Sequence, residues 1–532
     1  MQKKLLLGVE AIAQGAIDGG LSGVYAYPGT PSTEITEYIE SNPVAIERNL
    51  HRQWSANEKT AMEAALGMSY AGKRAMVCMK HVGMNVCADP FVNSAVTGIN
   101  GGIVIVAADD PSMHSSQNEQ DSRFYGDFAM ITILEPSTQQ QAYDMAYSAF
   151  EISEKTGLPV LIRITTRLAH SRSTVETKEL KSENEVHFPA DPRQFVLLPA
   201  IAKRRYANLL KMQEVLGDNS EKSAYNTFED ANSKTGIVAC GIAYNYLKET
   251  FNGNIPYPTL HIGQYPLPYK QIEKLSEKCD EIIVVEEGYP FVEQKIKGIS
   301  QKIRIKGKLD GTLPRQGELN PDITNEAFGI KSKNQYVTPE LVSPRPPALC
   351  QGCSHADMYE VLNQVMEQMG SNRVFGDIGC YTLGALPPYV AINSTVDMGA
   401  SITMAKGAAD SGVKHAVAVI GDSTFVHSGM TGLLDAVIEN TPITVIISDN
   451  STTAMTGGQK SHGENRIEKI CLGLGVDREH LHIITPMKNK HEEMFKVIKQ
   501  EVEYQGVSVI ISQRECIRTA ARKAAQKRAN LK

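Results

Sequence analysis

The sequence predicts an α/β protein that contains several parallel β-sheets with helices on both faces. Three observations support this fold class. Short apolar runs such as GIVIVAAD at residues 102–109 have the length and composition of buried parallel strands. Alanine-rich helical stretches separate these runs, as expected for strand–helix–strand units. The 42 glycines among 532 residues are typical of the turns that such units require.

Changes in composition divide the chain into four regions. The first alternates strands and helices, and its start, MQKKLLLGVEAIAQG, is typical of the first strand or helix of a folded domain. The second region is charged and irregular, and we expect a connecting segment that wraps the surface. The third is a smaller α/β domain, and the fourth resumes the alternation after a proline-rich hinge. The regions are residues 1–170, 171–234, 235–330 and 340–532, with the hinge at 338–350.

Each of the three α/β regions contains strand-like apolar runs. Besides residues 102–109, these runs are LPVLIRI (158–164), GIVACG (236–241), EIIVVEEG (281–288), AVAVIGD (416–422), PITVIISDN (442–450) and VSVIISQ (507–513).

The composition limits the function classes. A formal net charge of −6 provides no attraction to nucleic acid or to anionic membranes. No apolar run approaches the roughly 20 residues of a membrane-spanning helix, and Glu10 interrupts the first apolar stretch too early for a signal peptide. We therefore expect a cytoplasmic protein. Its nine cysteines favour metal ligation over disulfides in that compartment.

Two stretches of the chain are similar to one another. Residues 64–81 and 403–422 each contain an alanine-rich helix, then glycine and a basic residue, then a buried strand. Such units look alike in many α/β proteins, and coincidence is the simpler explanation. If the similarity reflects a duplication, the first and last domains are structural relatives and a cofactor could lie between them. The matching glycines are Gly67 with Gly407 and Gly72 with Gly412.

A carboxylate follows the apolar run 416–421. Burying Asp422 there is costly unless it pairs or binds a metal. Asn450 ends the next strand, 28 residues later, and a predicted crossover helix between them completes a βαβ unit. Ligands of open α/β sheets bind at the carboxyl ends of strands, where these oxygens suit Mg²⁺ that shares its shell with phosphate. A strand-end aspartate more often caps a turn, but the pairing with Asn450 favours the metal.

The Asp422–Asn450 spacing resembles the thiamine diphosphate (ThDP) motif, in which GDG is followed by N at this distance. Ser423 replaces the second glycine of that motif. A dinucleotide site is poorly supported, because no GxGxxG follows a strand. ThDP also needs a carboxylic acid that protonates its aminopyrimidine ring. Glu58, just before an alanine-rich helix, has the expected place, although a solvated glutamate is common at helix starts.

Longer motifs make the resemblance specific. They are YPGTPSTEI (27–35), NEKTAMEAALGMSYAG (57–72), MKHVGMNVCADP (79–90), MHSSQNEQDSR (113–123), GDIGCYTLG (376–384) and the stretch from GDSTFVHSG to TGGQ (421–459). With them the chain resembles, over almost its whole length, the large ThDP-binding subunits of indolepyruvate ferredoxin oxidoreductases, within the 2-oxoacid:ferredoxin oxidoreductase family. The resemblance implies two ThDP-binding-type three-layer α/β/α domains, one pyrimidine-binding and one diphosphate-binding, flanking a smaller transketolase-C-like α/β domain.

The resemblance also implies roles for single residues. Glu58 would activate ThDP, and Asp422, Asn450 and the carbonyl group of Thr452 would bind Mg²⁺. Thr30 would touch the carboxylate or oxo group of the substrate. Further substrate-facing groups are Lys80 and the catalytic candidate His81; Thr30 and His81 could equally be turn and core residues. Further cofactor contacts are implied for Tyr27, Pro28, Gly29, Met398, Gly399, Gly421 and Ser423.

Four cysteines have the spacing of a cluster site. Cys350 and Cys353 form a CxxC, Cys380 follows 27 residues later, and Cys516 lies beyond TGGQ. A CxxC can also be half a zinc site or a redox pair, but proline-rich residues precede this one where a thioredoxin-like motif needs a strand. Related oxidoreductases bind one [4Fe–4S] cluster with such a set, so the resemblance implies the same here. The others, expected to be buried apolar residues, are Cys78, Cys87, Cys240, Cys279 and Cys471.

The implied reaction is the oxidative decarboxylation of an aryl 2-oxoacid, such as indolepyruvate or phenylpyruvate, to its acyl-CoA, with electrons passed to ferredoxin. The implied partner is a small (beta) subunit, in a heterodimer or a dimer of heterodimers. The usual C-terminal ferredoxin-like domain is not in this sequence, which stops 16 residues after Cys516; we expect electrons to leave through the single cluster to a separate carrier. Alternatives are a non-oxidative ThDP decarboxylase or carboligase, which needs no cysteine quartet, and a catalytically silent subunit.

Overall fold

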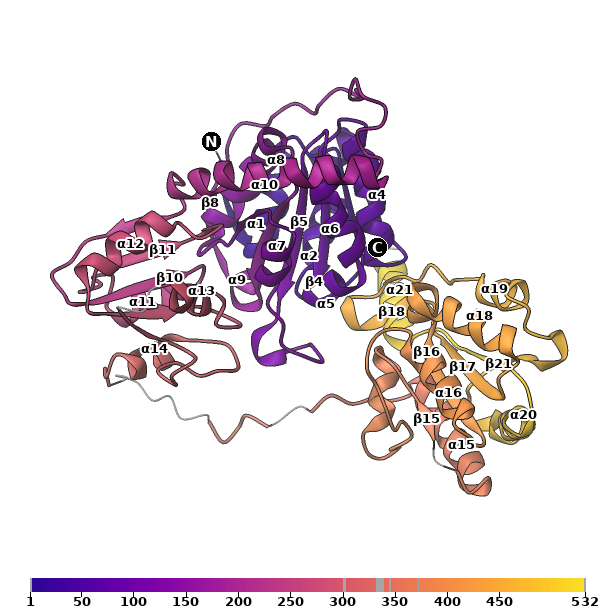
Figure 1. Ribbon diagram of the computed structural model, residues 1–532. Coiled ribbons are helices and arrows are strands. Elements are labelled where there is room, and N and C mark those ends of the chain that lie inside the picture. The colour runs from indigo at the N-terminus through magenta and orange to yellow at the C-terminus, as the bar shows by residue number, and fades with distance from the viewer. Residues whose placement is uncertain (1, 300–302, 332–338, 344–345, 372, 531–532) are drawn as a thin grey trace. The chain divides into compact units, whose positions relative to one another are not determined.

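The computed structural model describes residues 2–299, 303–331, 339–343, 346–371 and 373–530 (Figure 1). The chain forms two compact units, Met1–Val337 and Thr338–Lys532. The predicted hinge at 338–350 begins at this division and lies in part outside the described residues. Within the described part of the chain, no helix combines the length and the apolar character needed to cross a membrane.

The first unit contains a seven-stranded sheet whose strands are parallel except at one edge. The inner strands β4, β5 and β7 are buried along their whole length, which explains their continuous apolar sequence. The strand order is β12 (Gln264–Tyr265), β6 (Thr132–Leu134), β7 (Val160–Thr165), β5 (Ile103–Asp109), β4 (Ala75–Lys80), β2 (Gly23–Ala26) and β3 (His51–Trp54), with β12 antiparallel to β6.

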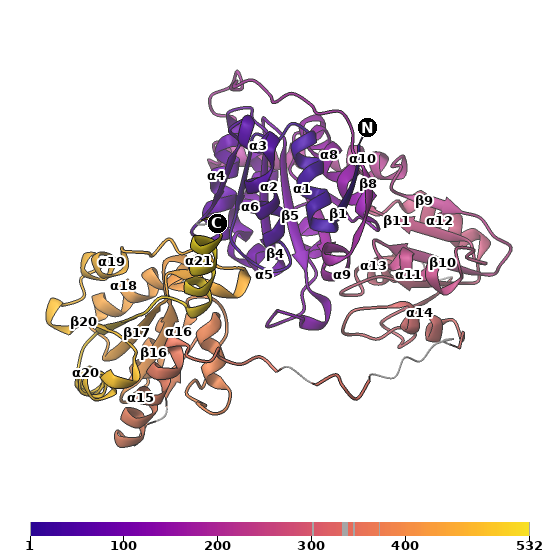
Figure 2. The ribbon, with the colours of Figure 1, turned by 180° about the vertical axis from the view of Figure 1, so that it is seen from behind.

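Helices cover both faces of this sheet, which confirms the three-layer prediction (Figures 1 and 2). Alternate strand residues point to opposite faces, so Val104 and Ile105 belong to different hydrophobic clusters. The start of the chain forms both a strand and a helix. The strand is β1 (Lys3–Leu7), which pairs with β8 (Arg172–Glu176), and the helix is α1. The main covering helices are α1 (Gly8–Asp18) and α8 (Gln139–Thr156) on one face, and α4 (Glu58–Tyr70) and α6 (Ala88–Thr97) on the other.

The prediction that residues 171–234 are irregular is wrong in part. Pro199–Glu221 form α10, a 23-residue helix that packs against α6 and β12. Proline at its first position suits a helix start, because the missing amide donor would be unpaired there in any case. Only Leu209, Leu216 and Ser220 of this helix are buried, so the sequence has no wide apolar stripe that would have marked it.

A second, five-stranded sheet lies in the same unit. Four of its strands are parallel to one another. The fifth strand, β9, lies at one edge and pairs antiparallel with its neighbour. The neighbouring β12, from the same part of the chain, joins the seven-stranded sheet instead. The region boundaries predicted inside this unit stay a prediction. The strand order is β14 (Arg304–Lys306), β13 (Glu281–Val285), β10 (Thr235–Cys240), β11 (Thr259–Ile262) and β9 (Thr227–Glu229).

The second unit is a wholly parallel five-stranded sheet between two helical layers. α15 (Ser354–Gln368) and α20 (His491–Glu503) cover one face. The other face is covered by α16 (Ala400–Asp410), α18 (Met430–Glu439) and α19 (Ile467–Gly473). The strand order is β15 (Val374–Phe375), β16 (Ala416–Gly421), β17 (Ile443–Asp449), β21 (Ser508–Gln513) and β20 (Leu481–Ile484).

The two similar stretches of sequence have the same local structure. α4 ends before Gly72, and α16 ends before Gly412; each glycine is left-handed, with φ of +89° and +95° respectively. Each then leads into a buried parallel strand, β4 or β16. A left-handed residue after a helix favours glycine, because a Cβ atom is disfavoured there.

Candidate functional site

Asp422 stands at the carboxyl end of β16 and is buried, with 2% of its surface exposed. No described residue forms a hydrogen bond with its Oδ2 atom. Burial, followed by the nearby charge of Asp449, raises the pKa of Asp422 to about 7. A buried carboxylate oxygen without a partner is unfavourable. This geometry suits a cation that would complete the site.

The neighbouring strand β17 supplies the second side of this site. Asp449 is already bonded within the protein, to the amide of Ser451 at 3.0 Å and to Gln513 Nε2 at 2.8 Å. Asn450 and Thr452 are buried, and Asn450 Oδ1 accepts a hydrogen bond of 3.2 Å from the Thr452 amide. These residues follow a strand that is paired in register with β16, so Asp422 and Asn450 lie on one sheet edge.

The loops after the two strands are linked by hydroxyl groups. Ser423, where the ThDP motif has glycine, forms a 2.7 Å hydrogen bond with Thr453 Oγ1. The chain after Asp422 continues through a π-helical turn, Phe425–Gly429, into α18. Short π-helical turns inside helices occur frequently at functional sites. The hydroxyl group of Ser423, which glycine would lack, thus links the loop after β16 to the loop after β17.

Asp377 is a further buried carboxylate at this edge that the sequence reasoning did not single out. It follows β15 and accepts hydrogen bonds from the Ser401 hydroxyl at 2.6 Å and from the Tyr381 hydroxyl. Burial raises the pKa of Asp377 to about 7. A Cβ atom on Gly421 would lie 2.6 Å from the Tyr381 ring, so glycine is required there. The sequence could have identified Asp377, because glycine precedes it just as glycine precedes Asp422.

Residues Met398 and Gly399 lead into α16 beside the π-helical turn. Gly399 is left-handed, with φ of +97°, and a Cβ atom there would lie 2.6 Å from the Ser428 side chain. Met398 is partly exposed. The predicted cofactor contacts of the second unit thus all lie at or near the carboxyl edge of one sheet.

The four spaced cysteines approach the same edge from three segments. Cys353 is the N-cap residue of α15, and its amide donates to the Cys350 carbonyl at 3.0 Å. The Cys516 amide donates to the Asn450 carbonyl at 3.2 Å. Burial, together with the nearby charges of Cys353, Asp422 and Cys516, raises the pKa of Cys380 to about 12. The thiolate form of Cys380 therefore needs a cationic centre.

His355 joins this cysteine region to the Asp422 edge. It is buried, and burial lowers its pKa to about 4, so the imidazole is neutral. Its Nε2 lies 3.2 Å from Cys380 Sγ and 3.4 Å from Asn450 Nδ2. The other five cysteines are buried, as predicted: Cys78, Cys87, Cys240, Cys279 and Cys471.

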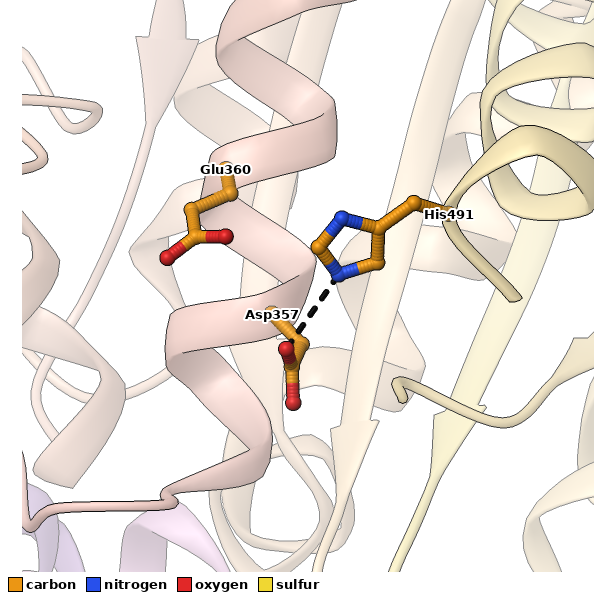
Figure 3. Close-up of side chains that lie close together, drawn as sticks. All are labelled: Asp357, Glu360 and His491. Carbon is orange, nitrogen blue, oxygen red and sulfur yellow. Dashed lines mark hydrogen bonds and ion pairs between the residues drawn. The ribbon is translucent and has the colours of Figure 1, made fainter. Parts of the chain in front are cut away.

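Asp357, Glu360 and His491 form a separate cluster between α15 and α20 (Figure 3). His491 lies 3.2 Å from Asp357. The guanidinium of Arg514 also bonds Asp357, at 2.9 Å, and donates to the Gly352 carbonyl at 3.2 Å. Because this cation already neutralises Asp357, we assign no metal site there. The contacts instead tie the CxxC loop to the segment that carries Cys516.

In the first unit, the candidate residues lie at the carboxyl edge of the seven-stranded sheet. The segment Tyr27, Pro28, Gly29 and Thr30 follows β2, and Glu58 begins the helix after β3. Lys80 ends β4, His81 follows it, and Asp110 follows β5. Because these strands are parallel neighbours, their carboxyl ends meet at one edge, the usual ligand-binding edge of such sheets.

Glu58 is buried, with 5% of its surface exposed, so the alternative of a solvated helix-start glutamate does not hold. Asn57 caps α4 by accepting a 2.8 Å hydrogen bond from the Thr60 amide, which fixes the helix start. A Cβ atom on Gly83 would lie 2.6 Å from Glu58 Cγ. Glycine at that position therefore makes the space that the glutamate side chain occupies.

Thr30 and His81 lie beside this edge with different environments. The backbone amide of Gly29 donates to Thr33 Oγ1 at 3.0 Å, so the segment that contains Thr30 is a structured turn. His81 is buried; its Nε2 lies 3.2 Å from Asn118 Oδ1, while Nδ1 has no hydrogen-bond partner among the described residues. An unsatisfied ring nitrogen favours a ligand-facing histidine over a core residue.

Comparisons with known proteins agree with this geometry. Residues 14–233 match the family model described as "Pyruvate flavodoxin/ferredoxin oxidoreductase, thiamine diP-bdg". Residues 377–512 match "Thiamine pyrophosphate enzyme, C-terminal TPP binding domain". Each candidate edge therefore lies within, or close to, a segment that resembles known ThDP-binding domains.

Curated relatives cover nearly the whole chain. The chain is 39% identical to "Indolepyruvate oxidoreductase subunit IorA" of Archaeoglobus fulgidus, over 97% of this chain and 86% of that protein. It is 37% identical to the proteins of that name from Methanothermobacter thermautotrophicus and Pyrococcus horikoshii, over 97% of this chain and 87% and 86% of theirs. A solved structure of 2-oxoglutarate:ferredoxin oxidoreductase from Magnetococcus marinus has a similar fold, with a TM-score of 0.50 at 16% identity, over 61% of this chain and 65% of that one.

Proposed function

The chain belongs to the family of indolepyruvate oxidoreductase subunits called IorA, and we propose that it is the ThDP-binding subunit of an enzyme that oxidatively decarboxylates aryl 2-oxoacids. Indolepyruvate and phenylpyruvate are the proposed substrates, and an aryl-acyl-CoA is the proposed product. Family membership supports a ThDP-dependent 2-oxoacid oxidoreductase. The aryl substrate class comes from the names of the relatives and from the motifs of the chain.

The observation that carries the proposal is the buried Oδ2 of Asp422, which has no hydrogen-bond partner among the described residues. Mg²⁺ would be held there by Asp422, by Asn450 Oδ1 and by the Thr452 carbonyl group, with diphosphate oxygens completing its shell. When bound, ThDP supplies the carbanion chemistry that breaks the bond between the carboxyl and carbonyl carbons of a 2-oxoacid. The residues present fit this cofactor, since they offer oxygen ligands at a sheet edge and the buried Oδ2 of Asp422 has no hydrogen-bond partner in the part of the chain that the structure describes.

Glu58 is the proposed acid of the site. Its carboxyl group is buried at the sheet edge and would hold a proton against a ring nitrogen of the cofactor. Thr30 and His81 would face the substrate, because both stand at the same sheet edge as Glu58. Tyr27, Pro28 and Gly29 would line the approach to that edge.

Cys350, Cys353, Cys380 and Cys516 would hold one [4Fe–4S] cluster. The support is their convergence on the edge that carries Asp422 and Asn450, which would place a one-electron carrier beside the cofactor. CoA is the proposed acyl acceptor, and a ferredoxin-like protein is the proposed electron acceptor. The relatives are named as subunits, which supports a second, smaller subunit as partner.

The cofactor site is tested with Asp422→Asn, which keeps the shape and removes the charge. We expect the variant to lose retention of ThDP and Mg²⁺ in equilibrium dialysis while its circular dichroism stays unchanged. Asp435→Asn is the matched control, because Asp435 is an exposed carboxylate on α18 of the same unit. Equal cofactor retention by the wild type and Asp422→Asn would refute the assignment.

The oxidative reaction is tested by the iron content and visible spectrum of anaerobically purified protein. We expect about four irons per chain, and turnover of phenylpyruvate that depends on CoA, the small subunit and a ferredoxin-like acceptor. A colourless, iron-free preparation with full decarboxylase activity would favour the non-oxidative alternative.

A further inference from the structure

Lys80 is a buried cation at the carboxyl edge of the seven-stranded sheet. It ends β4, and only 8% of its surface is exposed. Lysine is rarely buried without a paired charge, because its ammonium group loses hydration. The partners of Lys80 therefore decide whether its charge is satisfied by the protein.

The hydrogen bonds of the ammonium group come from one neutral loop residue. Lys80 Nζ donates to the Ser115 carbonyl at 2.8 Å and to Ser115 Oγ at 3.1 Å. Asp110 Oδ2 forms a long ion pair with Lys80 Nζ at 4.0 Å, which is beyond hydrogen-bond distance. An ammonium group has three N–H donors, so one remains without a hydrogen bond among these contacts.

Asp110 is held at that distance by other donors. Its carboxylate accepts hydrogen bonds from the Ser115 amide at 2.8 Å, the Ser116 hydroxyl at 2.6 Å and the Thr166 hydroxyl at 2.7 Å. Consistent with an incompletely compensated charge, burial lowers the pKa of Lys80 to about 8, although Asp110 opposes the shift. A second carboxylate that bonds Lys80 directly would compensate its charge better.

The loop that carries Ser115 is anchored at one end and exposed in the middle. Ser112 and Met113 are both left-handed, with φ of 67° and 53°, a conformation that is uncommon for side chains other than glycine. Beyond Ser115, the Glu119 carboxylate accepts from the Gly317 amide at 3.0 Å, and the Glu119 carbonyl accepts from the Tyr289 hydroxyl at 2.8 Å. Ser115 itself is exposed, so a ligand can displace it without breaking the anchor.

The turn that contains Thr30 lies beside Lys80 and Ser115. Ser115 Oγ lies 3.4 Å from the Thr30 carbonyl, and a Cβ atom on Gly29 would lie 3.0 Å from the Lys80 Cβ. The turn predicted to face the substrate therefore touches both Lys80 and the loop residue that covers it.

We propose that Lys80 binds the carboxylate of the 2-oxoacid substrate, which replaces the contacts of Ser115. This inference rests on the proposed function and assigns the anionic end of the substrate to a specific cation. Lys80 then determines specificity, because it favours acids over uncharged carbonyl compounds of the same shape. The rival interpretation is a lysine that serves only to anchor the loop.

The test compares a charged and an uncharged ligand. The full chain, loaded with ThDP and Mg²⁺, is titrated calorimetrically with 3-phenylpropionate, which keeps the ring and carboxylate but has no oxo group to react, and with its methyl ester. We expect Lys80→Gln to lose about 10- to 100-fold in affinity for the acid, the scale of a charged hydrogen bond. Affinity for the ester should stay within about twofold, and Lys80→Arg should keep most of the affinity for the acid.

Two results would overturn the assignment. If Lys80→Gln binds the acid as the wild type does, Lys80 does not contact the carboxylate. If acid and ester weaken equally, Lys80 only anchors the loop. Ser115→Ala provides a second test that does not remove the cation, and it should bind the acid at least as tightly as the wild type; a tenfold loss would contradict displacement. A wild type that binds neither 3-phenylpropionate nor phenylpyruvate would refute the proposed function itself.

Discussion

A methyl group at Gly83 should displace the Glu58 carboxylate without altering the proposed Mg²⁺ ligands of the second unit. In the structure, a Cβ atom at Gly83 would lie 2.6 Å from Glu58 Cγ and 2.8 Å from Glu58 Oε1, whereas ordinary contact begins at 3.4 Å. The glutamate must therefore move by roughly 1 Å, a misplacement that can cost about 10²-fold in rate. Crowding of this kind also destabilises a core by about 1–3 kcal/mol.

The assay is kcat for phenylpyruvate with the small subunit and acceptor present, together with exchange of the C2 proton of bound ThDP followed by NMR. We expect Gly83→Ala to bind ThDP normally, to lower kcat by about 10²-fold and to slow the exchange. The direct substitution Glu58→Gln should cause a loss of roughly 10²–10⁴-fold, the usual scale for a positioned acid.

Gly67→Ala is the matched control for Gly83→Ala. Gly67 lies on α4, the helix that Glu58 begins, and no atom lies within 4 Å of a Cβ placed there. Its replacement should leave activity unchanged and stabilise the protein by about 0.5–1 kcal/mol, because alanine favours helix. Undiminished C2 exchange in Gly83→Ala, with the glutamate shown to have moved, would remove Glu58 from the mechanism.

Three further outcomes are expected. Asp422→Asn should raise the melting temperature of the cofactor-free chain, because it removes a buried carboxylate charge whose Oδ2 has no hydrogen-bond partner among the described residues; a lower melting temperature would contradict this. Affinity for 3-phenylpropionate should fall above pH 8 by about tenfold per pH unit, as Lys80 loses its proton, and the fall should be absent in Lys80→Arg; an equal fall in both would assign it to another group. Cys380→Ser should lower the iron content and bleach the visible absorption, whereas Cys471→Ser, at a buried core cysteine, should not.

The sequence predicted those parts of the fold that local patterns determine. The apolar runs became buried strands, and the Asp422 and Asn450 positions lie at strand ends, because a parallel strand needs a continuous apolar sequence and a polar end. The helix α10 was missed because its few buried residues leave no periodic signal. The many charged residues of this helix give its sequence the composition of a solvated loop.

Contacts between distant segments could not be predicted in this way. Glu58 and Gly83 are close only because α4 and the helix after β4 lie at one sheet edge. Likewise, Lys80 meets Ser115 in a loop that is anchored where the amide of Gly317, far away in the sequence, donates to the Glu119 carboxylate. The spacing of motifs in the sequence identifies candidate residues. Which of them are buried, and which groups they contact, is known only from the packed structure.

Asn450 gives a structural argument for oxidation over simple decarboxylation. Its side-chain amide nitrogen lies 3.6 Å from Cys380 Sγ, and its carbonyl group accepts a hydrogen bond from the Cys516 amide. The residue proposed to bind Mg²⁺ therefore touches two of the three cysteine-bearing segments. A decarboxylase or carboligase gains nothing from thiols at this edge, and the buried thiol of Cys380 beside Asp422 is electrostatically unfavourable as a thiolate. A cationic iron–sulfur core would offset part of the charge of its thiolate ligands, and a metal at Asp422 would offset that carboxylate, so each centre would lower the electrostatic cost of its own ligands.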